Sequence, residues 1–227
     1  IPYLSDGDPT WRVQAAKAFS SIKDAKAIEF LCPLLKDTVM EVRFAAAYSL
    51  GQIGDNAAEN CLVDAFDPSS NEGEILKLNG IILEALGKCG SERIMKYLSS
   101  ISTYLPGDTA LLMGQVLGLY RFGMRSMYSD EGTKRMVSMT INSQYPQEVR
   151  LMSAHYLART RNLVLDTFKN DLIPHFQREK SAEIRMVLDT ILGRINRIDA
   201  ENALIGGFNL ENDSRVKINI LRALRNK

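Results

Sequence analysis

The sequence predicts an all-α protein built as a superhelix of about seven helical hairpins, of which the first and the last are incomplete. Two observations predict this fold. One pattern of apolar and small residues recurs along the whole chain, and no segment alternates apolar and polar residues for long enough to form a convincing strand. Because a hairpin of two short helices cannot bury both of its faces alone, neighbouring hairpins must pack on one another. We therefore expect one continuous domain over residues 1–227, as part of a longer protein.

The recurring pattern is clearest between Glu41 and Asp55. Successive copies are about 34 residues apart, and individual steps vary, which places the length variation in the connecting loops. One apolar position marks the start of each copy: Trp11, Val42, Leu78, Leu111, Val149, Ile184 and Val216. The position eight residues later is also apolar in each copy: Phe19, Leu50, Leu86, Leu119, Leu157, Leu192 and Leu224. The pattern therefore predicts seven copies of one helix.

Each copy is expected to hold two helices. The recurring stretch forms the second, inner helix, which we call helix B, because Val42, Ala45, Ala46 and Leu50 lie on one helical face. A less regular helix, helix A, precedes it. Small residues such as Ala45 and Ala46 let neighbouring B helices approach closely.

Turn residues flank the predicted helix B. Asp8 and Asp37 stand in turns from helix A to helix B, where a carboxylate can accept hydrogen bonds from the free N–H groups of the next helix. Gly54 and Gly87 fall near the ends of B helices, where a left-handed cap favours glycine.

These residues resemble a known repeat. The turn at Asp37, followed six residues later by Arg43, is similar to the signature of HEAT repeats, so the fold would be a HEAT/armadillo-like solenoid. The run 45–55 resembles the short HEAT-like units first named from phycobilisome lyases. This resemblance implies a ladder of Asp and Arg residues along the repeats, interrupted at Asn79 and Leu112. The order of residues expected for tetratricopeptide repeats, which have a similar period, is not present.

A weaker resemblance concerns a longer parent protein. The stretches 18–24, 83–90 and 118–123 are similar to the HEAT arrays attached to cyclophilin-type peptidyl-prolyl isomerase domains in some bacterial proteins. The resemblance implies an accessory segment that orients substrate proteins. No isomerase residue can be assigned, because the sequence contains no trace of the β-barrel catalytic domain.

The composition excludes several classes of function. The chain has 28 basic and 27 acidic side chains and a net charge of +1, so it has no bulk attraction for nucleic acid or for an anionic membrane. No run of about 18 apolar residues occurs, so we predict no membrane span. The composition leaves the choice between a cytoplasmic and a periplasmic location open.

The three cysteines, Cys32, Cys61 and Cys89, lie about one repeat apart. Their odd number and the absence of a CxxC motif argue against a disulfide framework and against a zinc site. We expect three small buried residues.

Catalytic motifs are also absent. There are only two histidines, His155 and His175, and neither has a cysteine or carboxylate at ligand spacing. Nucleophile elbows, HExxH motifs, phosphate-binding loops and dinucleotide fingerprints do not occur. We therefore expect no catalytic residue, no cofactor and no metal in this chain.

Basic residues gather in the C-terminal third and suggest a contact surface. If the B helices line one face, some of these residues can form a cationic stripe suited to acidic or phosphorylated segments. The candidate partner-binding residues are Arg150, Arg159, Arg185, Arg194, Tyr120 and Tyr156. The alternative interpretation is ion pairing within the repeats, with Glu148, Glu179, Glu183, Asp189 and Asp199 as partners.

These observations favour a non-catalytic scaffold that binds a protein or peptide. Self-association through exposed solenoid ends is a further expectation. The alternatives are an accessory segment of a cyclophilin-type isomerase and a nucleic-acid-binding HEAT module. The nucleic-acid alternative is disfavoured because few aromatic residues lie among the basic ones.

Overall fold

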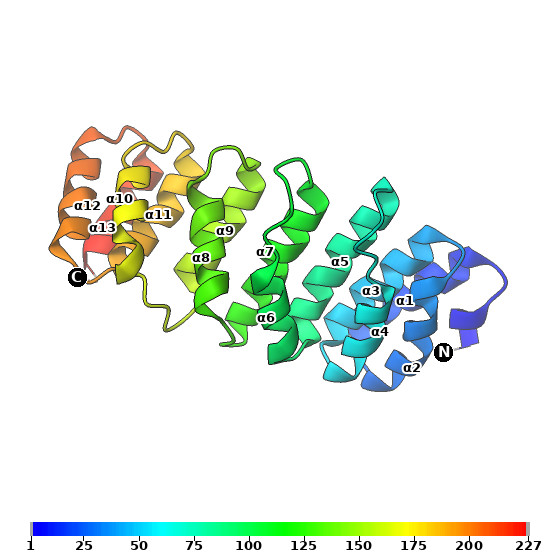
Figure 1. Cartoon of the computed structure of the whole chain (residues 1–227). Helices are drawn as coiled ribbons and strands as arrows, with labels where there is room; N and C mark the ends of the chain where they lie inside the picture. Colours follow the sequence, from blue (N-terminus) through cyan, green and yellow to red (C-terminus); the bar gives the residue numbers. More distant parts are fainter. Residues whose placement is uncertain (1, 226–227) are drawn as a thin grey trace. The chain divides into compact units, whose positions relative to one another are not determined.

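A computed structural model describes residues 2–225 and confirms the all-α repeat fold. Within these residues there are α-helices and short 3-10 helices and no strand. The chain divides into two compact units, unit 1 (Ile1–Ser129) and unit 2 (Asp130–Lys227), which we describe separately (Figure 1). The single continuous array that the sequence predicts over 1–227 stays a prediction.

Unit 1 contains four B helices that pack against one another in chain order. They are α1 (Pro9–Ile22), α3 (Met40–Ile53), α5 (Gly73–Cys89) and α7 (Thr109–Met124). The A segments between them are shorter and partly 3-10 helical: η1 (Pro2–Ser5), η2 (Ala25–Ala27), α2 (Ile28–Leu31), η3 (Cys32–Lys36), η4 (Asn56–Ala58), α4 (Glu59–Ala65) and α6 (Glu92–Ser100). Unit 1 is therefore a two-layer stack of hairpins, with a B layer of long helices and an A layer of short ones.

Unit 2 repeats this arrangement. Its B layer consists of α9 (Gln147–Arg159), α11 (Ala182–Arg194) and α13 (Ser214–Arg225), which pack side by side. Its A layer consists of α8 (Asp130–Ile141), η5 (Asp166–Phe168), α10 (Lys169–Phe176) and α12 (Ile198–Leu210). The predicted core face of helix B is confirmed in unit 2, because the marker residues Val149, Ile184 and Val216 are fully buried. The prediction is wrong for the first marker residue of unit 1, Trp11, which is 54% exposed in the first hairpin.

The capping predictions are confirmed at Asp8 and Gly54 and wrong at Asp37 and Gly87. Asp8 is the N-cap of α1 and accepts a hydrogen bond from the N–H of Thr10 at 2.8 Å. Asp37 accepts from the N–H of Val39 at 2.9 Å, but Val39 is itself the N-cap of α3, so this bond orders the turn before the helix. Gly54 ends α3 with a φ of 74°, in the left-handed region. Gly87 instead lies inside α5, where a Cβ atom would come within 2.5 Å of the Cα of Gly118 on α7. The absence of a side chain at Gly87 therefore serves close helix packing.

The cysteine prediction is corrected. Cys32 and Cys61 form a disulfide whose Cα atoms are 5.7 Å apart, and only Cys89 is a free thiol. The two bonded residues lie in η3 and α4, which are A segments of successive hairpins. A separation of 29 residues, close to one repeat, brings them together. Cys89 lies on a B helix and is buried as predicted, and burial raises the pKa of its thiol to about 12.

We predict that reduction of this disulfide lowers the free energy of unfolding by about 3 kcal/mol, because the bond closes a long loop in the unfolded chain. Urea unfolding with and without dithiothreitol measures the effect. The double substitution Cys32→Ser/Cys61→Ser should abolish the response to reductant, and Cys89→Ala should leave it intact. Alkylation of three thiols rather than one in the denatured, unreduced protein would contradict the disulfide.

Candidate binding site

An arginine near the start of helix B links successive hairpins, as the predicted ladder requires. Arg12 binds Asp37 through Nε and Nη2 at 2.8 and 2.9 Å, and it also donates to the carbonyls of Asp6 and Gly7 in its own turn. Asp37 in turn accepts the N–H of Val39 in the turn that leads into α3. One ion pair thus joins the start of one B helix to the turn that begins the next.

The same arrangement recurs in unit 2. Arg185 binds the two carboxylate oxygens of Glu211 at 2.6 and 3.0 Å and donates to the carbonyl oxygens of Glu179 and Lys180. Glu211 accepts hydrogen bonds from the backbone N–H groups that follow it in the turn. Burial opposes ionisation of Glu211, but Arg185 and these N–H groups outweigh it, so the pKa of Glu211 lies below its ordinary value.

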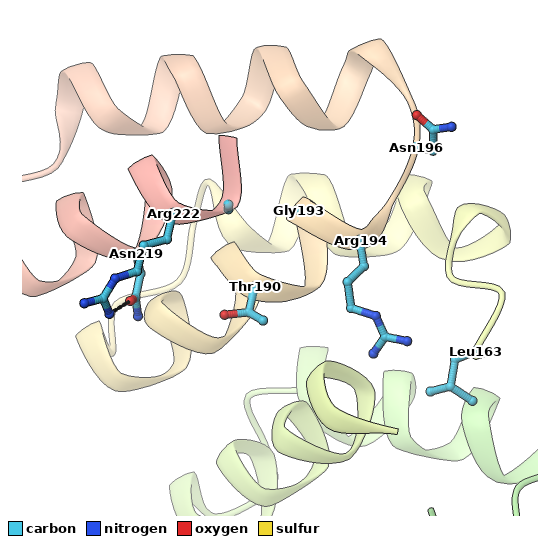
Figure 2. Close-up of a pocket in the computed structure, with 8 residues that line it drawn as sticks. Leu163, Thr190, Gly193, Arg194, Asn196, Asn219 and Arg222 are labelled. Atoms are coloured by element: carbon cyan, nitrogen blue, oxygen red, sulfur yellow. Dashed lines mark hydrogen bonds between the residues drawn. The ribbon is translucent and has the colours of Figure 1, made fainter. Parts of the chain in front are cut away.

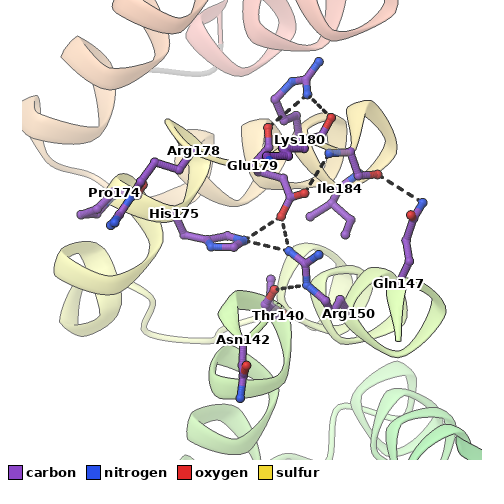
Figure 3. A network of polar contacts seen from close by, with 12 residues as sticks. Thr140, Asn142, Gln147, Arg150, Pro174, His175, Arg178, Glu179, Lys180 and Ile184 are labelled. Carbon is purple, nitrogen blue, oxygen red and sulfur yellow. Dashed lines mark hydrogen bonds and ion pairs between the residues drawn. The ribbon is translucent and has the colours of Figure 1, made fainter. Parts of the chain in front are cut away.

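Arg150 is the most enclosed arginine of the ladder (Figure 3). Its guanidinium binds Glu179, donates to the carbonyl oxygen of Thr140 at 3.2 Å, and lies 3.2 Å from Nε2 of His175. Nε2 of His175 is also 2.9 Å from a carboxylate oxygen of Glu179. Burial lowers the pKa of His175, which favours the neutral imidazole, although Glu179 partly opposes the shift. These groups border a pocket of about 600 Å³, which Arg178 and Lys180 also line.

The ladder is interrupted at the two predicted positions, but other side chains serve the same turns. Asn79 donates to the carbonyl oxygen of Asp67 at 2.6 Å and accepts from the N–H of Asp67 at 3.1 Å. At the next repeat Leu112 is fully buried, and Gln115, three residues later, donates to the carbonyls of Leu98 and Ile101. Amide side chains therefore replace guanidinium groups where the ladder arginine is missing.

Three of the six predicted partner-binding residues lie in the interior. Tyr156 is 1% exposed, with its hydroxyl 3.3 Å from that of Thr133, and Tyr120 is 8% exposed. Arg150 is 9% exposed and belongs to the ladder network. Burial makes direct contact of these three side chains with a partner unfavourable, and Arg185, half-buried, is also a ladder residue. Arg159 and Arg194 stand at the ends of their B helices, outside the ladder.

Arg194 borders a second pocket of unit 2, of about 830 Å³, between α11 and α13 (Figure 2). Its guanidinium donates to the carbonyl oxygens of Leu157, Ala158 and Thr160 at the end of α9. Arg222, which is exposed, donates to the side-chain oxygen of Asn219 at 3.3 Å. The lining is polar and cationic and contains no carboxylate: Leu163, Thr190, Gly193, Arg194, Asn196, Asn219, Arg222 and Ala223.

Charge on the B layer is distributed differently in the two units. From the ladder position to the end of each B helix, unit 2 carries one acidic residue, the buried Asp189. The basic residues in these stretches are Arg150, Arg159, Arg185, Arg194, Lys217, Arg222 and Arg225. In unit 1, Lys88 and Arg121 both form ion pairs with Glu84, at 3.0 and 2.9 Å. These two B-layer cations of unit 1 are thus paired with a carboxylate of the same layer.

Asp189 breaks the repeat pattern. Its side chain is fully buried on α11, and neither carboxylate oxygen has a hydrogen-bond partner among residues 2–225. Burial, with a smaller contribution from nearby Glu211, raises the pKa of Asp189 to about 8. In the five preceding repeats the equivalent residue is apolar and fully buried: Ala16, Ala47, Leu83, Val116 and Ala154. The sequence-based interpretation of Asp189 as an ion-pair partner is therefore wrong.

The comparisons with known proteins agree with this geometry. Residues 1–73 match the family of HEAT repeats. Over 99% of its length the chain is similar to a phycocyanin lyase structure, the complex of CpcE and CpcF from Nostoc sp. PCC7120, with a TM-score of 0.54, 14% identity and 91% of that chain covered. It is also similar to human deoxyhypusine hydroxylase in complex with glycerol, with a TM-score of 0.48, 17% identity and coverage of 99% of this chain and 82% of that one. No curated protein sequence matches the chain.

The fold is thus that of a HEAT-like helical-repeat protein, as the sequence predicts. Within the described part of the chain, none of the helices combines the length and apolar character needed to cross a bilayer. No group of three or more potential metal ligands occurs among residues 2–225.

We predict that Glu179→Gln lowers the free energy of unfolding by about 3 kcal/mol at pH 7, because it leaves Arg150 buried without a counter-charge. Urea unfolding measures the change. Glu92→Gln is the matched control, since Glu92 pairs with Lys96 on the surface with both side chains 66% exposed, and it should leave the stability nearly unchanged. Equal effects of the two substitutions would contradict the assigned network.

We predict that Asp189→Ala raises the free energy of unfolding by about 1–3 kcal/mol at pH 8, because a buried carboxylate without a partner is costly. The pKa of Asp189 is raised on folding, so the folded chain binds its proton more tightly and stability is lost as pH rises from about 4 toward 8. The gain from Asp189→Ala should therefore shrink at pH 5. The exposed Asp171→Ala serves as the control and should give the same small change at both pH values.

Proposed function

We propose that this chain is a non-catalytic scaffold that binds protein partners through the B layer of unit 2. The observation that carries the proposal is the run of basic side chains between the ladder position and the end of each B helix, where the one acidic residue, Asp189, is buried. The exposed Glu148 and Glu183 lie in the first turns of α9 and α11, before these stretches. Arg150 and Arg185 are paired with Glu179 and Glu211, so the cations beyond the ladder are Arg159, Arg194, Arg222 and Arg225. A surface with an excess of one charge attracts segments of opposite charge and directs their approach.

The contacts of the other polar groups support a non-catalytic role. His175, Glu179 and Arg150 satisfy one another and hold two hairpins together. Burial lowers the pKa of His155, the second histidine, and Arg159 adds to this effect. The similar structure from Nostoc is a complex of two proteins, which gives this fold a precedent for protein partners.

The proposed partner is a protein with an acidic segment. A nucleic-acid partner would favour aromatic residues among the cations, and the pocket beside Arg194 is lined by none. An accessory role beside a cyclophilin-type isomerase domain remains the second proposal. It rests on the sequence resemblance and places catalysis outside this chain.

The test uses a fluorescein-labelled peptide of 20 glutamates as an acidic probe. We predict that the wild-type chain binds it, that salt weakens the binding, and that Arg159→Glu/Arg222→Glu lowers the affinity by at least about tenfold. The control is Lys134→Glu/Lys180→Glu, which makes the same change in net charge at exposed positions outside the B helices. Equal losses in the two variants, or tighter binding of a DNA duplex of the same charge, would overturn the proposal.

A further inference from the structure

The three B helices of unit 2 present side chains in the same register. On α9 the residues Leu151, His155 and Arg159 follow one another at intervals of four, and so lie along one face. On α11 the equivalent residues are Met186, Thr190 and Arg194. At 1.5 Å per residue, the apolar and cationic side chains of each helix are about 12 Å apart along the axis.

The third helix extends the apolar row and shifts the cationic one. On α13 the residue equivalent to Leu151 and Met186 is Ile218, which is 49% exposed. Arg222 follows four residues later, so it is equivalent to His155 and Thr190 and lies about one turn closer to the apolar residue than Arg159 and Arg194 do. We call Leu151, Met186 and Ile218 the apolar band, and Arg159, Arg194 and Arg222 the cationic band. Because α9, α11 and α13 pack side by side, both bands cross the B layer of unit 2, the cationic band with a step of one turn at α13.

We infer that these two bands bind an acidic amphipathic segment of a partner protein, a site that rests on the function proposed above. Apolar side chains of the segment pack on the apolar band. Its carboxylates enter the pocket between Arg194 and Arg222, where the hydroxyl of Thr190 and the amide of Asn196 provide further hydrogen-bond donors.

The guanidinium of Arg194 is preorganised for binding an anion. The guanidinium of Arg194 is held in place by three backbone carbonyls, which are neutral, so its position is fixed and its charge is not cancelled. A binding group that is already ordered loses less conformational entropy when the ligand binds. Arg222 is exposed and supplies a second, adjustable cation at the same pocket.

The apolar band favours a protein segment over a phosphate-rich ligand. A nucleic-acid backbone would cover Ile218 and Met186 without any apolar surface to bury against them, whereas an amphipathic segment supplies it. The equivalent positions of unit 1 differ. On α3, Phe44 and Tyr48 lie beneath Lys77 and Lys88, at 5.0 and 5.5 Å from nitrogen to ring centre. On α7 the equivalent cation, Arg121, is paired with Glu84 at 2.9 Å.

The experiment compares two 14-residue peptides of the same leucine and glutamate composition. One has leucines at helical i, i+3, i+4 and i+7 spacing, and the other has the same residues scrambled. We expect the amphipathic peptide to bind about tenfold more tightly than the scrambled one, since only it can match both bands. Fluorescence anisotropy at one fixed ionic strength measures both affinities.

Matched variants measure the contribution of each band to peptide binding. Ile218→Ser should weaken binding of the amphipathic peptide several-fold and leave the scrambled peptide unchanged, whereas Arg222→Gln should weaken both. Ile205→Ser, at a residue 46% exposed on α12 in the other layer, is the control for folding and should change neither affinity. Thermal unfolding of all variants confirms that each is folded.

The outcomes distinguish this inference from the proposed function. If the two peptides bind equally and Ile218→Ser has no effect, the amphipathic site is overturned, while a loss with Arg159→Glu/Arg222→Glu still supports an acidic partner. If neither peptide binds, or if both bind Arg222→Gln as tightly as the wild type, both proposals fail.

Discussion

An arginine at the start of helix B, bonded to a carboxylate of the next turn, is the interaction on which three of the hairpin junctions depend, at Arg12, Arg150 and Arg185. A guanidinium has five N–H donors in a rigid plane, so one side chain can bind carbonyls on one side and a carboxylate on the other. Arg185 uses this geometry to join its own turn to the turn of the next hairpin through Glu211. The carboxylate then orders the turn before the next helix by accepting the backbone N–H groups of Asn212 and Asp213. The rotation of each B helix is thereby tied to that of its neighbour, which places equivalent side chains in rows.

The ladder also explains why basic residues of the same type have different roles. Arg150 and Arg159 stand on the same helix, but the first is enclosed by Glu179 and His175 and the second is exposed. An arginine at the start of helix B can reach a turn on either side, whereas one at the end meets the carbonyl ends of neighbouring helices. Position within the repeat, rather than residue type, therefore decides whether an arginine is available to a partner.

Sequence periodicity predicted the helices and the core face of helix B, and the resemblance to HEAT repeats implied a ladder of Asp and Arg residues, in which Arg12 pairs with Asp37. Those features depend on residues close in sequence or at a fixed repeat spacing. The role of Gln115 could not be predicted, because a glutamine three residues after the ladder position reaches carbonyls only in the folded geometry.

The disulfide was missed for a different reason. Cys32 and Cys61 are separated by nearly one repeat, so they lie at neighbouring points of successive A segments. The odd number of cysteines and the absence of a CxxC motif do not reveal this proximity. At the candidate site the sequence indicated the basic helices. The sequence could not show that Arg150 forms an ion pair and that Arg194 does not, because both arginines have acidic residues nearby in sequence. The structure shows that Arg150 pairs with Glu179, whereas Arg194 bonds backbone carbonyls.

The burial of Asp189 affects the net charge of the B layer in unit 2. An ionised, exposed carboxylate at this point of α11 would lie on the helix that carries Thr190 and Arg194 and would offset part of their positive field. Burial instead keeps the carboxyl protonated up to a pH of about 8. The acidic residue in these stretches is therefore neutral under most conditions, so the cationic band acts with its full charge. The cost is a polar group in a position that every preceding repeat fills with an apolar side chain.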